Sequence, residues 1–189
     1  MMVGVKKVLI ANRGVCACRI MKTCEKMAID YVTIFTPDDY QSIHATESKE
    51  KYKVNSYGNI DDIIRVATAS SSDGIHPGYG FQAENPIFPQ KCNEAGIAFI
   101  GPTAENMLSL GNKIAAKQVG TLDGINMPTA SSSDLILDLQ EALEWGHVIG
   151  YPVLLKSPNG GGGIGIELCD DKEQVNFRQI FLYRTVWQI

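Results

Sequence analysis

A run of glycines late in the sequence is the residue pattern that most clearly indicates a chemical role. Five of six consecutive positions are glycine, namely Gly160, Gly161, Gly162, Gly163 and Gly165. A backbone this free of side chains can approach a ligand closely and point N–H groups at it, and such concave turns bind phosphate oxygens. Lys156 lies just before the run and can add an ammonium charge. The run therefore predicts a phosphate-binding loop, with a flexible surface hairpin as the alternative.

Two common nucleotide-binding motifs do not fit this context. A P-loop continues with Gly-Lys-Ser/Thr and then a helix, whereas here Ile164 and a strand-like segment follow. A dinucleotide fingerprint places three glycines between the first strand and helix, whereas only Gly14 stands there. A strand, a glycine loop and a second strand instead predict a flap that folds over a nucleotide.

Two turns near the amino end also carry groups that can contact a ligand. Asn12-Arg13-Gly14 follows the first apolar run, and an arginine guanidinium is a good fork donor to an anion. The segment 76–81, His-Pro-Gly-Tyr-Gly-Phe, displays Tyr79 on a loop shaped by proline and Gly80. On the residues alone, a structural turn with Tyr79 and Phe81 packed inward is the favoured reading.

The first hundred residues alternate short apolar runs with helical patterns. We expect strands at 8–11, 31–35, 73–76 and 97–100, and helices at 17–27, 60–69 and 86–95. This alternation is typical of an α/β protein with a parallel, Rossmann-like sheet covered on both faces. Parallel strands end at one edge, where ligands bind. The turns at 12–14 and 77–80 should lie together on that edge.

After residue 103 the pattern changes. We expect helices at 104–111, 113–119 and 135–149, and the start of another within 170–179. Strands are expected at 153–156 and 166–169, on either side of the glycines, and a polar loop or hinge at 121–133. The final ten residues, IFLYRTVWQI, are apolar and aromatic, so we expect them to bind a partner or to aggregate.

The composition excludes several classes of protein. Lys plus Arg is 17 and Asp plus Glu is 21, a net charge of −4, which argues against a nucleic-acid binder. There is no stretch of membrane-spanning length and no secretory signal, so we expect a cytosolic protein, with the mitochondrial matrix or a plastid left open. The five cysteines form no disulfide or zinc framework. His44 and His147 lack partners at catalytic spacing and are read as surface or helix residues.

Taken together and in order, these segments resemble the biotin carboxylases. The resemblance rests on KVLIANRG at 7–14, HPGYGF at 76–81 with Glu84-Asn85, FIGP at 99–102, GNKIAAK at 111–117, and GYPVLLK with GGGG at 150–163. It implies a pre-ATP-grasp domain at residues 1–112 and the start of an ATP-grasp domain at 113–189. The sequence does not distinguish among the biotin carboxylase parts of four enzymes, the acetyl-CoA, propionyl-CoA, methylcrotonyl-CoA and pyruvate carboxylases.

The resemblance also implies a reaction and its site. That family uses ATP, bicarbonate and Mg²⁺ or Mn²⁺ to carboxylate biotin carried on a protein or domain. Lys113 and Lys156 match the lysines that contact ATP phosphates, and Gly160–Gly163 with Gly165 match the loop that closes over them. Tyr79 and Gly80 match the loop on the bicarbonate and biotin side. The implied partners include a second copy or a full-length carboxylase.

Several positions depart from the family pattern. Val15 stands where a glutamate is usual, Asn112 replaces an aspartate, and Ile164 replaces a basic residue. The resemblance fades after Asp170, and the family's metal-binding carboxylates and its catalytic base lie in a segment that would follow Ile189. We therefore expect little or no turnover by this chain alone. The alternative is a non-catalytic module that pairs with a full-length carboxylase; another ligase of the superfamily, such as a carbamoyl-phosphate enzyme, fits less well.

Overall fold

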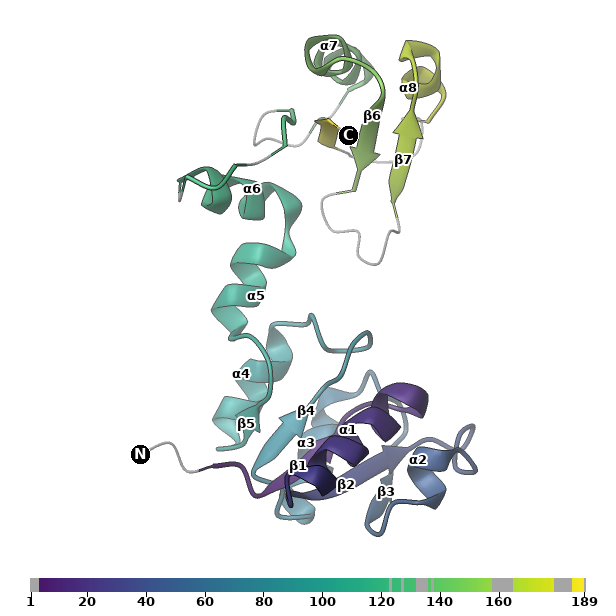
Figure 1. Ribbon diagram of the computed structural model, residues 1–189, viewed down its shortest axis with the longest axis vertical. Helices are drawn as coiled ribbons and strands as arrows, with labels where there is room; N and C mark the ends of the chain where they lie inside the picture. Colours follow the sequence, from purple (N-terminus) through teal and green to yellow (C-terminus); the bar gives the residue numbers. More distant parts are fainter. Residues whose placement is uncertain are drawn as a thin grey trace. The chain divides into compact units, whose positions relative to one another are not determined.

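Short apolar runs in the first hundred residues form a five-stranded parallel sheet, in the order β3-β2-β1-β4-β5 (Figure 1). Its strands are β1 (Lys7–Ile10), β2 (Asp30–Phe35), β3 (Lys51–Lys53), β4 (Gly74–His76) and β5 (Ala98–Phe99). The connecting helices are α1 (Gly14–Lys26), α2 (Ile43–Thr46), α3 (Ile60–Ala69) and α4 (Ile87–Glu94). The predicted α/β parallel-sheet fold is confirmed.

The computed structural model describes residues 4–122, 124–126, 128–131, 136, 138–157, 165–178 and 185–188. The chain divides into two units, Met1–Met107 and Leu108–Ile189. The boundary lies a few residues before the predicted one between 112 and 113. The assignment of the two parts as family domains stays a prediction at this point.

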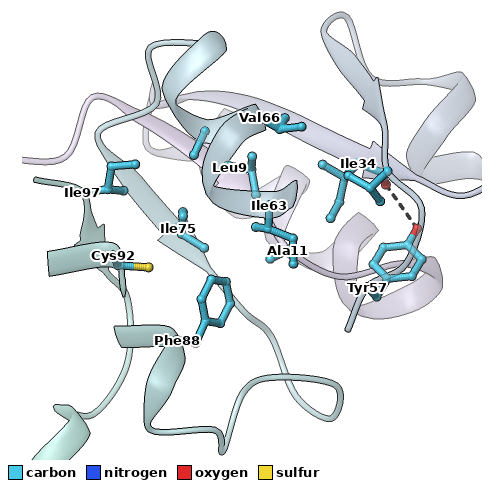
Figure 2. Packing of buried hydrophobic residues seen from close by; sticks show 12 residues of the cluster. Leu9, Ala11, Ile34, Tyr57, Ile63, Val66, Ile75, Phe88, Cys92 and Ile97 are labelled. Atoms are coloured by element: carbon cyan, nitrogen blue, oxygen red, sulfur yellow. Dashed lines mark hydrogen bonds between the residues drawn. The ribbon is translucent and has the colours of Figure 1, made fainter. Parts of the chain in front are cut away.

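Side chains of β1 face two separate cores. Val8 and Ile10 lie in a cluster shared with α1, whereas Leu9 lies in a larger cluster shared with α3 and α4. Figure 2 shows the larger cluster, in which Leu9 is surrounded by side chains such as Ile63 and Ile75. Because neighbouring strand residues point to opposite faces, both faces of the sheet are covered by helices, as the sequence predicted.

The element boundaries follow local signals where these exist. The α3 helix spans the predicted residues because the Asn59 side chain caps it, accepting from Asp62 N at 3.1 Å. The sequence reading missed β3 and α2. The first is the three-residue edge strand Lys-Tyr-Lys and the second has four residues, so neither shows a full period of hydrophobicity.

The second unit is built on an antiparallel sheet in the order β7-β6-β8. Its elements are α6 (Lys113–Leu122), α7 (Leu139–Ile149), β6 (Val153–Lys156), β7 (Ile166–Cys169), α8 (Lys172–Arg178) and β8 (Thr185–Gln188), and α5 (Ala104–Gly111) contains the boundary between the units. The core combines residues of the sheet with α7 and α8; its buried members are Ile136, Ala142, Val153, Leu155, Cys169 and Val175.

Three expectations for this unit need correction. The loop expected from Thr121 begins later, because α6 continues to Leu122. The helix expected from residue 135 begins at Leu139, where the Asp138 carboxylate accepts from Glu141 N at 2.8 Å. The segment 185–188, part of the end expected to bind a partner or to aggregate, is strand β8 and pairs with β6 of the same unit. No helix among the described residues is long and apolar enough to cross a bilayer.

Candidate functional site

Asn12 joins the two turns that follow β1 and β4. Its Nδ2 donates to the carbonyl oxygens of Pro77 at 2.7 Å and Tyr79 at 2.8 Å, and its Oδ1 accepts from Arg13 N at 2.8 Å. The side chain is buried. The predicted meeting of these turns at the carboxyl edge of the sheet is confirmed, and we call residues 12–14 and 77–81 the loop edge.

Close backbone approach fixes the second of these turns. Gly78, Gly80 and Phe81 all have positive φ, at +66°, +69° and +42°. A Cβ on Gly78 would lie 2.3 Å from Cys16 Sγ, so only glycine fits there. Gly78 N also donates to His76 Nδ1 at 3.0 Å. The left-handed conformation of Phe81 is costly for a residue with a side chain, and such strain is common at functional loops.

The expectation that Tyr79 and Phe81 pack inward is wrong. Tyr79 is 70% exposed and Phe81 is 50% exposed. Phe81 stacks on Tyr57 with ring centroids 5.0 Å apart, and the Arg13 guanidinium lies 5.8 Å from the centre of the Phe81 ring. The loop edge therefore presents one aromatic ring to solvent at Tyr79 and braces a second one at Phe81.

His44, interpreted from the sequence as a surface or helix residue, does lie on a helix, α2, but it is not on the surface. His44 is 0% exposed and lies with Tyr57 and Asp39 behind the loop edge. Tyr57 Oη is 3.1 Å from His44 Nε2 and donates to Asp39 Oδ2 at 2.8 Å; Figure 2 shows its further contact with the carbonyl of Ile34, at 3.2 Å. Sequence spacing gave no signal for this group, since its members come from separate segments.

Burial sets the charge states in this group. Burial lowers the pKa of His44 below 6.5, although the nearby Asp39 carboxylate acts in the opposite direction. Burial and the Asp39 carboxylate both raise the pKa of the Tyr57 hydroxyl. Burial likewise lowers the pKa of His76. At neutral pH the two histidines are therefore neutral and Tyr57 keeps its proton.

In the second unit, the two lysines singled out from the sequence interact. Lys113 is the first residue of α6, and Lys156 is the last residue of β6. Burial lowers the pKa of Lys156 below 10.5, and the positive charge of Lys113 lowers it further. The fold therefore brings the two ammonium groups within electrostatic range of each other. Whether they bind phosphate stays a prediction.

Side-chain caps and ties hold α6 in place. Asn112 Oδ1 accepts from Ile114 N at 2.9 Å and from Ala115 N at 3.2 Å, so asparagine serves as the helix cap where the family has aspartate. At the other side, Lys117 Nζ donates to the carbonyl oxygens of Ala130 and Ser131. The sequence reading gave no role to Lys117, which the structure shows anchoring the following segment.

The base of the glycine loop is closed by a backbone hydrogen bond. Ser157 N donates to the Gly165 carbonyl at 2.8 Å, and Gly165 has φ +76°. A Cβ on Gly165 would lie 2.9 Å from the Ser157 Cβ. Gly160–Gly163, as well as the unusual Ile164, lie outside the described residues. Val15, which stands where a glutamate is usual in the family, lies on α1 and its side chain is 83% exposed.

The predicted site residues divide between the two units. Tyr79 and Gly80 belong to the first unit, and Lys113, Lys156 and Gly165 belong to the second. Within the described part of the chain, no group of three or more His, Cys, Asp or Glu side chains could hold a metal ion. The described side chains alone therefore form no ready-made ligand cluster for Mg²⁺ or Mn²⁺.

The fold and these motifs define an α/β protein with an ATP-grasp-like second part, and comparison with known proteins agrees. Residues 4–107 match the biotin carboxylase N-terminal domain, and residues 113–181 match the ATP-binding domain of the carbamoyl-phosphate synthase L chain. The chain belongs to the biotin carboxylase family. The resemblance stated from the sequence is thereby confirmed.

Several relatives are similar over nearly all of the chain. The biotin carboxylase of Halalkalibacterium halodurans is 42% identical over 90% of this chain and 39% of its own length. The 2-oxoglutarate carboxylase small subunit of Hydrogenobacter thermophilus is 40% identical over 90% of this chain and 37% of its own. The chain thus spans about two fifths of these curated relatives.

Solved structures give the same result. The biotin carboxylase domain dimer of H. thermophilus 2-oxoglutarate carboxylase, in complex with MgADP, ADP and bicarbonate, has a TM-score of 0.87 and 34% identity over 97% of this chain and 44% of that one. The biotin carboxylase–βγ-ATP complex from Campylobacter jejuni has a TM-score of 0.87 and 29% identity, covering 98% of this chain and 45% of that one.

Proposed function

We propose that this chain binds the polyphosphate of ATP with Lys113 and Lys156, as part of the ATP- and bicarbonate-dependent carboxylation of protein-linked biotin. The observation that carries the proposal is the effect of the Lys113 charge on the neighbouring Lys156. The pKa of Lys156 is lowered by burial and by the charge of Lys113. Two like charges close together repel each other, and a bound polyphosphate would offset that repulsion.

Helix α6 adds to this positive field. Its amino end, where Lys113 lies, carries the positive end of the helix dipole. A cation is normally disfavoured at that end of a helix, so Lys113 is poorly placed for stability. It is well placed to join Lys156 in binding a group with several negative charges. A triphosphate is such a group, and an uncharged or singly charged ligand would gain less.

The remaining candidate residues are assigned roles on the same basis. We assign Gly160–Gly163 and Gly165 to a loop whose N–H groups contact the phosphates, which the closed base at Ser157 and Gly165 supports. We assign Tyr79 and Gly80 to the side of bicarbonate and biotin, which the exposure of Tyr79 supports. Bicarbonate, a biotin carrier protein and a second carboxylase copy are the proposed partners.

Phosphoryl transfer depends mainly on positioning and on neutralising charge. The lysines orient the phosphates and neutralise part of their charge. A divalent ion, when bound, supplies a large further part of that neutralisation. Because the described residues show no cluster of metal ligands, we assign no step to it. The proposed role of this chain is nucleotide binding and orientation.

Isothermal titration of the purified chain with ATP and with AMP tests the proposal. We expect ATP to bind more tightly than AMP. Loss of a charge-assisted hydrogen bond costs about 1.5–3 kcal/mol, so Lys156→Ala and Lys113→Ala should each weaken ATP binding about 10- to 100-fold. Lys172→Ala removes the same charge from an exposed position in the same unit and is the matched control.

Three results would overturn the proposal. The first is ATP affinity that neither Lys156→Ala nor Lys113→Ala changes, which would mean that the nucleotide binds elsewhere. The second is equal affinity for ATP and AMP, which would show that the polyphosphate is not what the chain recognises. A similar loss in the Lys172→Ala control would mean that overall charge, rather than this pair of lysines, determines binding.

A further inference from the structure

Three buried polar side chains from separate segments meet behind the loop edge. Asp39, His44 and Tyr57 are 8%, 0% and 4% exposed, respectively. The Tyr57 hydroxyl bridges the other two, at 2.8 Å from Asp39 Oδ2 and 3.1 Å from His44 Nε2. A buried polar network that is fully hydrogen-bonded holds its members in one arrangement, whereas a partly satisfied one is unfavourable. This group is thus a rigid element beside the loops.

The hydrogen bonds fix the tautomer of His44. Gly14 N, at the start of α1, donates to His44 Nδ1 at 3.3 Å, so Nδ1 must be the unprotonated nitrogen. The proton of the neutral ring is then on Nε2 and is donated to Tyr57 Oη, whose own proton goes to Asp39. The three side chains form a directed chain of donors that starts at the backbone of α1 and ends at a carboxylate.

This network of three side chains contacts both turns of the loop edge. Asp39 Oδ2 lies 3.9 Å from the Arg13 guanidinium, and the Tyr57 ring stacks on Phe81. Arg13 also lies over the Phe81 ring. Both ends of the network therefore contact the turn after β1, at Gly14 and Arg13, and its middle supports the turn after β4.

We propose that His44 is a positioning residue that holds the loop edge in one conformation through Tyr57 and Asp39. In this role it touches no substrate. It orders Phe81, which directly follows the Tyr79–Gly80 turn, and so sets how that turn is presented. That this turn contacts bicarbonate and biotin rests on the proposed function. The ordering of the loop edge by His44 does not depend on it.

The charged and titratable groups that face His44 are Asp39, Tyr57 and, beyond them, Arg13. Protonation of His44 would place an N–H on Nδ1 against the N–H of Gly14, so the two would repel. The Asp39 carboxylate, 4.0 Å from His44 Nε2, would partly offset this. The loop edge should therefore change when His44 becomes charged.

Two substitutions of His44 separate its two hydrogen bonds. The amide of asparagine lies near the position of Nδ1, so His44→Asn keeps an acceptor for Gly14 N and loses the contact with Tyr57. The amide of glutamine reaches the position of Nε2, so His44→Gln keeps a donor to Tyr57. Tyr57→Phe removes the bridging hydroxyl and keeps the stacking on Phe81. His147→Gln, at an exposed position of α7, is the control.

The readout is the amide spectrum of the ¹⁵N-labelled full chain below its melting temperature. We expect His44→Asn and Tyr57→Phe to shift or broaden the amide signals of Gly80 and Phe81. His44→Gln should change them much less, and His147→Gln not at all. In the wild type these signals should follow the titration of His44 as the pH falls, and His44→Gln should remove that inflection while leaving the one due to His76.

The ring nitrogens of the wild-type protein provide a test that needs no variant. Their ¹⁵N shifts should show His44 as the Nε2–H tautomer at neutral pH. An Nδ1–H tautomer, or Gly80 and Phe81 signals that both His44→Asn and Tyr57→Phe leave unchanged, would overturn the proposal. ATP binding should be intact in all these variants, since Lys113 and Lys156 are retained. A wild-type chain that binds no ATP would overturn the proposed function and leave this result standing.

Discussion

Asn12 offers the sharpest stability test of the loop edge. Its side chain is buried and makes three hydrogen bonds, to the carbonyl oxygens of Pro77 and Tyr79 and from Arg13 N. Asn12→Ala removes all three. Asn12→Asp keeps the shape and the bond from Arg13 N, and sets a carboxylate against the two carbonyl oxygens.

The size of the effect follows from these contacts. A typical hydrogen bond contributes about 1 kcal/mol, and a buried group left without a partner costs about 1–3 kcal/mol. Three lost bonds therefore predict that Asn12→Ala lowers the free energy of unfolding by about 3 kcal/mol. Asn12→Asp should cost at least as much, because burying a charge beside two acceptors is worse than leaving a gap. With an ordinary urea dependence, the midpoint moves down by roughly 1–2 M.

Urea unfolding followed by far-UV circular dichroism measures this change. Both tryptophans, Trp145 and Trp187, belong to the second unit. Tryptophan fluorescence therefore reports that unit separately in the same samples. We expect the dichroism midpoint to fall in both Asn12 variants. Asn93→Ala, at an exposed position of α4, removes the same side chain where it has little structural role and should stay within about 0.5 kcal/mol of the wild type.

The reasoning fails if Asn12→Ala is as stable as Asn93→Ala. It also fails if Asn12→Asp is markedly more stable than Asn12→Ala, because a carboxylate cannot donate to the two carbonyl oxygens. Either result would mean that the loops after β1 and β4 are not held together by this side chain.

Three further predictions follow from single positions. Gly165→Ala should destabilise the hairpin base by about 1–3 kcal/mol, because φ is +76° and the added Cβ meets Ser157; local proteolysis rates measure this. Folding lowers the pKa of His44 and of His76, so the unfolded chain takes up protons first as the pH falls. The free energy of unfolding should therefore be full above pH 6.5 and decrease below it, which urea midpoints measured at several pH values will show. Burial raises the pKa of Cys92 to about 12, so iodoacetamide should label the half-buried Cys18 of the native protein well before Cys92, as mass spectrometry can verify.

The topology of the first unit was readable because it follows from a few general rules. Buried strands alternating with helices imply a parallel sheet, and parallel strands end at one edge. That was enough to place Asn12 beside the turn at 77–80, sixty-five residues away from Pro77, and the structure confirms it. The edge strand β3 was missed because its alternation of lysine and tyrosine buries too little to stand out.

The buried network behind the loop edge was not readable from the sequence. His44 makes its bonds with Gly14 and Tyr57, which are far from it in sequence and have no characteristic spacing. The packing of α2 against α1 and β2 buries His44. A short polar segment such as α2 gives no sequence pattern that predicts this packing. Similarly, the exposure of Tyr79 depends on the positive φ of Gly78 and Gly80, and residue types alone could not decide it.

The most direct test of the central claim is the pKa of the Lys156 amine in the presence of inorganic tripolyphosphate. The chain is labelled with ¹³C-lysine, the Lys156 signal is assigned by its loss in Lys156→Arg, and the pH is raised stepwise. Binding of the anion should raise the pKa, which burial and Lys113 hold below 10.5 in the unliganded chain, and Lys113→Ala should raise it even without the anion. A pKa that saturating tripolyphosphate leaves unchanged would contradict the claim that these two lysines bind polyphosphate.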